Sequence, residues 1–93
     1  MDVTAIIKRI EAERKVGANQ DFKIRDIIVT TDEQYPQTLS IQFVQGKCEE
    51  LDKFAPGQKV KIDINLRGKE TTKDDGKVVV FNTIQGWSIA EAV

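Results

Sequence analysis

The sequence predicts an all-β fold: a closed five-stranded Greek-key barrel with one short helix between the third and fourth strands. Five segments rich in β-branched and aromatic residues alternate with breaks that contain glycine, proline, asparagine or aspartate. One segment, residues 46–54, changes period, because Cys48, Leu51 and Phe54 recur at every third position and favour a helix. With 93 residues the chain has room for one domain, 1–93, with one core.

The first strand is expected over residues 3–12, where the pattern is least regular. Val3, Ala5 and Ile7 occupy alternate positions, but Ile10 breaks strict alternation. An amphipathic helix is the competing interpretation, since the segment contains good helix formers. We favour a strand with a bulge near Lys8-Arg9 because further strands follow, and we place a loop at residues 16–21.

The second and third strands are expected over residues 22–31 and 37–44, separated by a turn at Pro36. In the third strand, Leu39, Ile41 and Phe43 form the buried face. The register of the second strand stays open. If Ile27 and Val29 point inwards, an apolar stripe points outwards, and the opposite register buries that stripe. The stripe consists of Phe22, Ile24 and Ile28.

The fourth and fifth strands are expected around a long polar tip. QKVKIDINLRG has the most regular alternation in the chain, and its inward face would hold Val60, Ile62, Ile64 and Leu66. Asp75-Gly76 marks the turn, and KVVVFNTIQGWSI forms the last strand. Five strands with a helix between the third and fourth is the order of the oligonucleotide/oligosaccharide-binding (OB) fold. Residues 67–77 would then be the loop between strands 4 and 5, a loop that this fold commonly uses to hold ligands.

The remaining aromatic residues are assigned by their position in the strands. Phe43 and Phe54 are expected in the core. Trp87 is expected in the core or at an interface, because it shares the parity of Phe81 and Ile89 in the last strand, which should close the barrel. Tyr35 precedes Pro36 and is expected to pack on the barrel edge.

The composition argues against an enzyme or a metal protein. The chain has no histidine and a single cysteine, so the commonest general base and the commonest metal ligand are missing. The glycines are scattered singly and form no phosphate loop, and no cofactor is expected. No apolar run is long enough to span a bilayer, and the lone cysteine fits a reducing cytoplasm.

Three stretches, DEQYPQTLSIQFV, KCEELDKFAPGQKVKIDINLRGKE and FNTIQGWSI, carry a resemblance to a known family. The sequence resembles short bacterial proteins classed as a domain of unknown function and similar to single-stranded-DNA-binding barrels. That family commonly has a tryptophan just after RGKE, where this chain has TTKDDGK. The resemblance implies a cytosolic barrel that binds single-stranded nucleic acid and forms a homodimer or higher homo-oligomer.

Binding to single strands requires cations for the phosphates and aromatic faces for the bases. The net charge of −1 excludes a strongly basic domain, but residues 57–73 carry five basic and two acidic side chains. The predicted binding residues are Phe22, Lys23, Arg25, Lys59, Lys61, Arg67 and Lys69. Their predicted partner is single-stranded DNA or RNA, bound with little sequence preference. The alternative is a self-associating interaction module that binds no nucleic acid and buries the outward stripe of strand 2.

Overall fold

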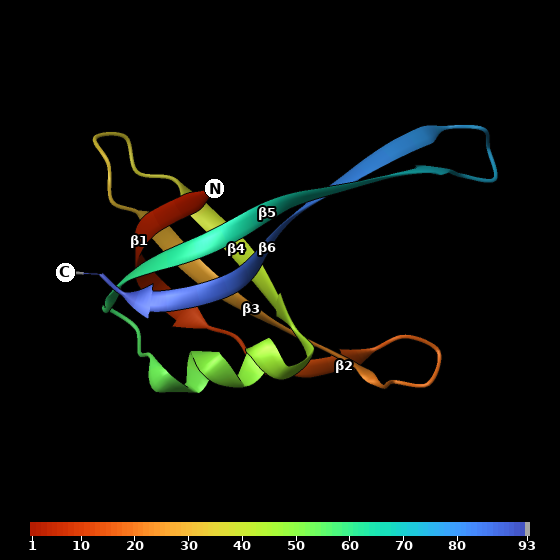
Figure 1. Cartoon of the computed structure of the whole chain (residues 1–93). Coiled ribbons are helices and arrows are strands. Elements are labelled where there is room, and N and C mark those ends of the chain that lie inside the picture. Colours follow the sequence, from red (N-terminus) through yellow and green to blue (C-terminus); the bar gives the residue numbers. More distant parts are fainter. Residues whose placement is uncertain (93) are drawn as a thin grey trace.

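The computed structural model describes residues 1–92, and Val93, the last residue of the expected single domain, lies outside the described residues. Within them the predicted all-β fold is confirmed (Figure 1). The elements in chain order are β1 (Asp2–Ile10), β2 (Arg14–Val16), β3 (Phe22–Thr31), β4 (Thr38–Val44), the 3-10 helix η1 (Gln45–Lys53), β5 (Lys59–Thr72) and β6 (Val78–Glu91). None of the described helices is long and apolar enough to cross a membrane.

Five of these strands close into a ring in the order β1-β5-β6-β4-β3, and β1 pairs again with β3. The pairing of β4 with β6 is parallel and short, joining Ile41 to Ile84 and Gln42 to Gln85, and the others are antiparallel. A register shift between Ile7 and Arg9 confirms the bulge predicted in β1. A bulge bends the strand locally. β1 pairs with β5 on one edge and with β3 on the other.

The core fills the ring and is closed at one end by η1. The predicted helix and its apolar spacing are confirmed, since Cys48 and Leu51 are fully buried and Phe54 packs against the core. The most buried core side chains are Ile7, Ile27, Val29, Ile41, Phe43, Leu51, Val60 and Ile62. Tyr35 does not pack on the barrel edge as expected, because its turn leaves the side chain 74% exposed.

The register of β3 is now fixed. Ile27 and Val29 point into the core, as in the first of the two alternatives. The outward apolar stripe is nevertheless not exposed, since Ile24 and Ile28 are also buried. β3 is paired on both edges by β1, β2 and β4, so side chains on its outer face are flanked from both sides. Phe22 alone of the stripe is substantially exposed, at 40%.

A bulge in β6 explains the position of the only tryptophan. Asp63 pairs with Ser88 and Ile64 pairs with Gly86, so Trp87 is an extra residue with no partner on β5. Trp87 is therefore not a core residue: its side chain is 49% exposed. Simple alternation from Ile89 placed it inside, and the inserted residue shifts that alternation by one.

The polar tip is a two-stranded arm and not the loop that we expected for residues 67–77. β5 and β6 remain paired out to Thr72 and Val78, and only residues 73–77 form the turn. There Lys73 N donates to Lys77 O (2.8 Å), and Gly76 adopts a φ of 84°, which favours glycine. We call residues 66–83 the arm, and it projects far from the barrel (Figure 1). Leu66 was expected in the core but is 66% exposed, because β5 leaves the barrel at this point.

Candidate nucleic-acid interface

A groove lies where the arm leaves the barrel. It has a volume of about 640 Å³ and runs between the outer face of β3–β4 and the first residues of the arm. Its lining residues are Asp26, Ser40, Gln42, Leu66, Arg67, Gly68, Asn82, Thr83 and Ile84. The one carboxylate among them, Asp26, is paired with Arg14 at 2.9 Å, which neutralises its charge. The groove therefore offers apolar surface and hydrogen-bonding groups without an unpaired negative charge.

A second hollow, of about 460 Å³, lies on the arm beside this groove. Arg67, Lys69, Thr71, Phe81 and Thr83 line it together with Gly68. The register places Lys69 directly opposite Phe81 and Arg67 opposite Thr83, so these side chains share one face of the arm. Phe81 is 55% exposed. An open aromatic ring thus lies beside two cationic side chains.

The cations of this hollow are available to an anion. Among residues 1–92 neither Arg67 nor Lys69 takes part in an ion pair. Arg67 Nε donates to Gln85 Oε1 at 2.7 Å, which orients the guanidinium group, and within residues 1–92 its other donors have no side-chain partner. Glu70 points to the opposite face of the arm by strand alternation, so the acidic neighbour lies away from the hollow.

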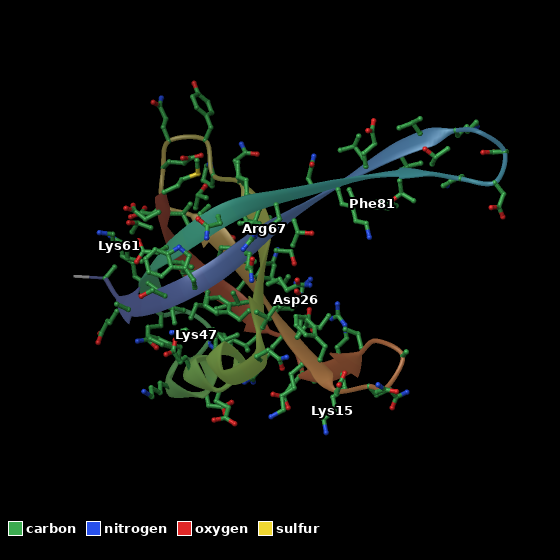
Figure 2. The ribbon with its side chains drawn as sticks, turned by 45° about the vertical axis from the view of Figure 1, so that its right-hand side comes forward. Lys15, Asp26, Lys47, Lys61, Arg67 and Phe81 are labelled. Atoms are coloured by element: carbon green, nitrogen blue, oxygen red, sulfur yellow. The ribbon has the colours of Figure 1, made fainter. Side chains whose placement is uncertain are left out.

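The two lysines predicted at the other end of β5 lie on the same face of that strand as Arg67 and Lys69. Figure 2 shows Arg67 between Lys61 and Phe81 along the β5–β6 ribbon. Lys61 is six residues from Arg67, roughly 20 Å of strand. Lys59 pairs with Asp32 at 2.9 Å and Lys61 with Asp2 at 3.9 Å, and both pairs are exposed. The structure therefore places Lys59 and Lys61 on the same strand face as Arg67 and Lys69, but at a distance from the hollow.

Lys23 and Arg25 lie on the other face of β3 and do not join the hollow. Arg25 Nε donates to Glu11 O (2.9 Å), while its Nη1 donates to Cys48 O (3.2 Å) and Asp52 Oδ1 (2.7 Å). These bonds tie β3 to η1 and to the chain after β1. The surrounding pocket is otherwise acidic, with Glu13, Glu49 and Asp52 in its lining.

Burial raises the pKa of the Cys48 thiol beneath this cluster, with the Glu13 carboxylate adding in the same direction. Cys48 Sγ donates to Phe43 O at 3.3 Å. Burial and the Glu13 carboxylate keep the thiol protonated and unreactive, so Cys48 is a structural residue.

Phe22 is the first residue of β3, the strand whose Asp26 lines the groove. It shares the outer face of β3 with Asp26, four residues or roughly 13 Å further along. The hairpin of β2 with β3, which the sequence pattern did not indicate, pairs Val16 with Phe22 and holds it there. Phe22 therefore offers a second aromatic surface on the same face of β3 as Asp26, outside the residues that line the groove.

Reasoning from the sequence missed Phe81. We treated residues 67–77 as an unpaired loop, and in that case no residue of β6 could be matched with Lys69. The signal was only partial: a two-residue turn at Asp75-Gly76 would pair Lys69 with Asn82, whereas the turn in the structure places residues 74–76 between the paired Lys73 and Lys77 and so brings Lys69 opposite Phe81.

We compared the chain with protein-family models, with curated proteins and with solved structures. A family model described as "Domain of unknown function (DUF3127)" matches residues 2–90. None of the curated proteins matches the sequence. Among solved structures, the mitochondrial single-stranded DNA binding protein Rim1 of S. cerevisiae is similar, with a TM-score of 0.62 over 98% of this chain and 93% of that chain. The two sequences are 14% identical, so the likeness concerns the fold.

Proposed function

The chain belongs to the DUF3127 family, and we propose that it is a non-enzymatic OB-fold protein that binds single-stranded DNA across the base of its arm. Its fold is similar to that of a protein named for binding single-stranded DNA. Fold alone does not decide function, so the proposal depends on the residues of the site.

The observation that carries the proposal is the hollow formed by Arg67, Lys69 and Phe81. Single-strand binding without sequence preference combines cations that follow the backbone with aromatic rings on which bases stack. Arg67 and Lys69 point to the same face of β5 and are about 7 Å apart. That separation is of the order of the distance between successive phosphates in an extended strand. A base stacked on Phe81 would leave its phosphate beside Lys69.

The neighbouring groove gives the strand a path towards the barrel. Arg67, Gly68 and Thr83 line both the hollow and the groove, so the two are continuous around the arm base. From there the outer face of β3 leads to Phe22. Stacking accepts any base, because every base has a π-face, so we expect little sequence preference.

Fluorescence anisotropy of a labelled oligo-dT of about thirty bases, at about 20 mM and about 200 mM salt, tests the proposal. We expect binding that weakens as salt rises, because phosphate contacts release counterions. Phe81→Ala should cost about 1–3 kcal/mol, which is about 5- to 150-fold in Kd. Lys69→Ala should weaken binding and lower the salt slope by about 0.7.

The matched control is Lys47→Ala, which removes an exposed lysine of η1, away from the arm. It should bind like the unchanged protein. Absence of binding at low salt, or equal losses for Lys47→Ala and Lys69→Ala, would refute the proposed site. In the first case the self-associating interaction module is the function that remains.

A further inference from the structure

The two edges of the arm differ in chemistry. The β5 edge carries Arg67, Lys69 and Glu70 together with Gly68. The β6 edge, residues 78–83, reads VVVFNT, with no charge, glycine or proline. Proteins protect exposed edges with charges, prolines or bulges, because an uncharged edge of β-formers pairs with another strand. The β5 edge is protected in this way and the β6 edge is not.

Among residues 1–92, the backbone of the β6 edge has hydrogen-bonding groups without a partner. The bond from Lys73 N to Lys77 O identifies these residues as a hydrogen-bonded pair. Hydrogen-bonded and non-hydrogen-bonded pairs alternate in an antiparallel ladder, so Val79 and Phe81 point their N–H and C=O groups towards β5. Val78, Val80 and Asn82 therefore point theirs outwards. Within residues 1–92, β4 pairs with β6 only at Ile84 and Gln85, beyond this stretch.

We infer that this edge pairs with the same edge of a second copy of the chain, antiparallel and centred on Val80. A second copy is the partner because the backbone groups of this edge match those of an identical edge placed antiparallel to it. In this register Val80 faces the partner's Val80, and Val78 faces the partner's Asn82. All three outward residues then join hydrogen-bonded pairs on both copies, about six bonds in all. A register centred on Val79 or Phe81 uses only two of the three.

The side chains agree with the same register. Val79 would lie against the partner's Phe81 in a close, non-hydrogen-bonded pair, a favourable combination of a β-branched and an aromatic residue. Val80 meets its own copy on the other face, and no like charges are opposed. Opposed residues of an antiparallel pair point to one face, so both copies present Arg67 and Lys69 on the same side of a four-stranded arm.

Sedimentation over a range of protein concentrations tests the pairing. The unchanged protein should approach twice the 10.5 kDa of one chain as concentration rises. Val80→Pro should remain monomeric, because it removes an outward N–H and leaves the β5 ladder intact. Glu70→Pro is the matched control: Glu70 lies opposite Val80 on the other edge, and this variant should still dimerise. A monomeric unchanged protein, or a dimeric Val80→Pro, would overturn the inference.

A cysteine pair tests the register without proline. The Cα atoms of the two copies of residue 80 would be about 5.5 Å apart, within the range that a disulfide spans. Val80→Cys should therefore form a covalent dimer on mild oxidation. Val78→Cys should not, since the two copies would be roughly 13 Å apart along the strands. The native Cys48 is buried and does not interfere. Cross-linking of Val78→Cys equal to that of Val80→Cys would contradict this register.

Discussion

The ring of Phe43 packs against the backbone of Gly86 in the centre of the barrel. A Cβ at position 86 would overlap that ring and would come within 3.0 Å of Ile41 Cγ2. Both neighbours are fully buried, so neither can move without disturbing the core. Gly86 thus permits the close approach of β6 to β4 where the barrel closes, directly before the bulge at Trp87.

Gly86→Ala is therefore expected to destabilise the fold by about 1–3 kcal/mol through overpacking. Urea unfolding gives the free energy of unfolding. Gly46→Ala is the control, because a Cβ at position 46 meets nothing within 4 Å. If both variants unfold at the same urea concentration, the close packing of Phe43 against Gly86 is not what limits residue size at position 86.

At the scale of elements, Arg25 links three segments of the barrel. Its guanidinium group holds Glu11 O, Cys48 O and Asp52, and so fixes η1 against β3. Arg67, on the exposed arm, donates a hydrogen bond to Gln85. The two arginines both looked like phosphate ligands in the sequence, yet their surroundings give them different roles.

We expect alanine substitution of these two arginines to have opposite effects on stability and on DNA affinity. Arg25→Ala should lower the free energy of unfolding by about 1–3 kcal/mol, because two carbonyl groups and a carboxylate lose their donor. It should leave DNA affinity per folded molecule unchanged. Arg67→Ala should weaken DNA binding and change stability by less than about 0.5 kcal/mol. Urea unfolding and fluorescence anisotropy on both variants measure these effects. A loss of DNA affinity in Arg25→Ala would show that Arg25 belongs to the binding surface after all.

The elements that the sequence predicts well are those set by local pattern. The five barrel strands, the helix with its three-residue spacing and the bulge in β1 all follow from side-chain periodicity. The arm and the exposed Trp87 do not, for two physical reasons. The arm is largely exposed on both faces, so it leaves no alternation of burial to read. The bulge in β6 shifts the side-chain alternation directly after Gly86, and a glycine within a strand does not by itself distinguish a bulge from a close backbone approach. Of the residues that line the hollow, Arg67 and Lys69 are among the binding residues predicted from the sequence and Phe81 is not.

For the whole molecule, the arm makes the protein elongated, with extents of 48 × 33 × 19 Å. The groove lies at the base of the arm, and the arm carries Arg67, Lys69 and the exposed ring of Phe81. The arm and η1 lie on different sides of the barrel (Figure 1). The proposed DNA path therefore crosses the junction between barrel and arm and stays clear of η1.

The most direct test of this account is a titration of the ¹⁵N-labelled protein with a short oligo-dT, followed by amide chemical shifts. We expect the largest shifts at residues 66–69 and 81–84 and along the groove face at Asp26, Ser40 and Gln42. Residues of η1 should change little. Shifts centred on η1, or no shifts at low salt, would contradict the claim that the arm base is a single-stranded-DNA site.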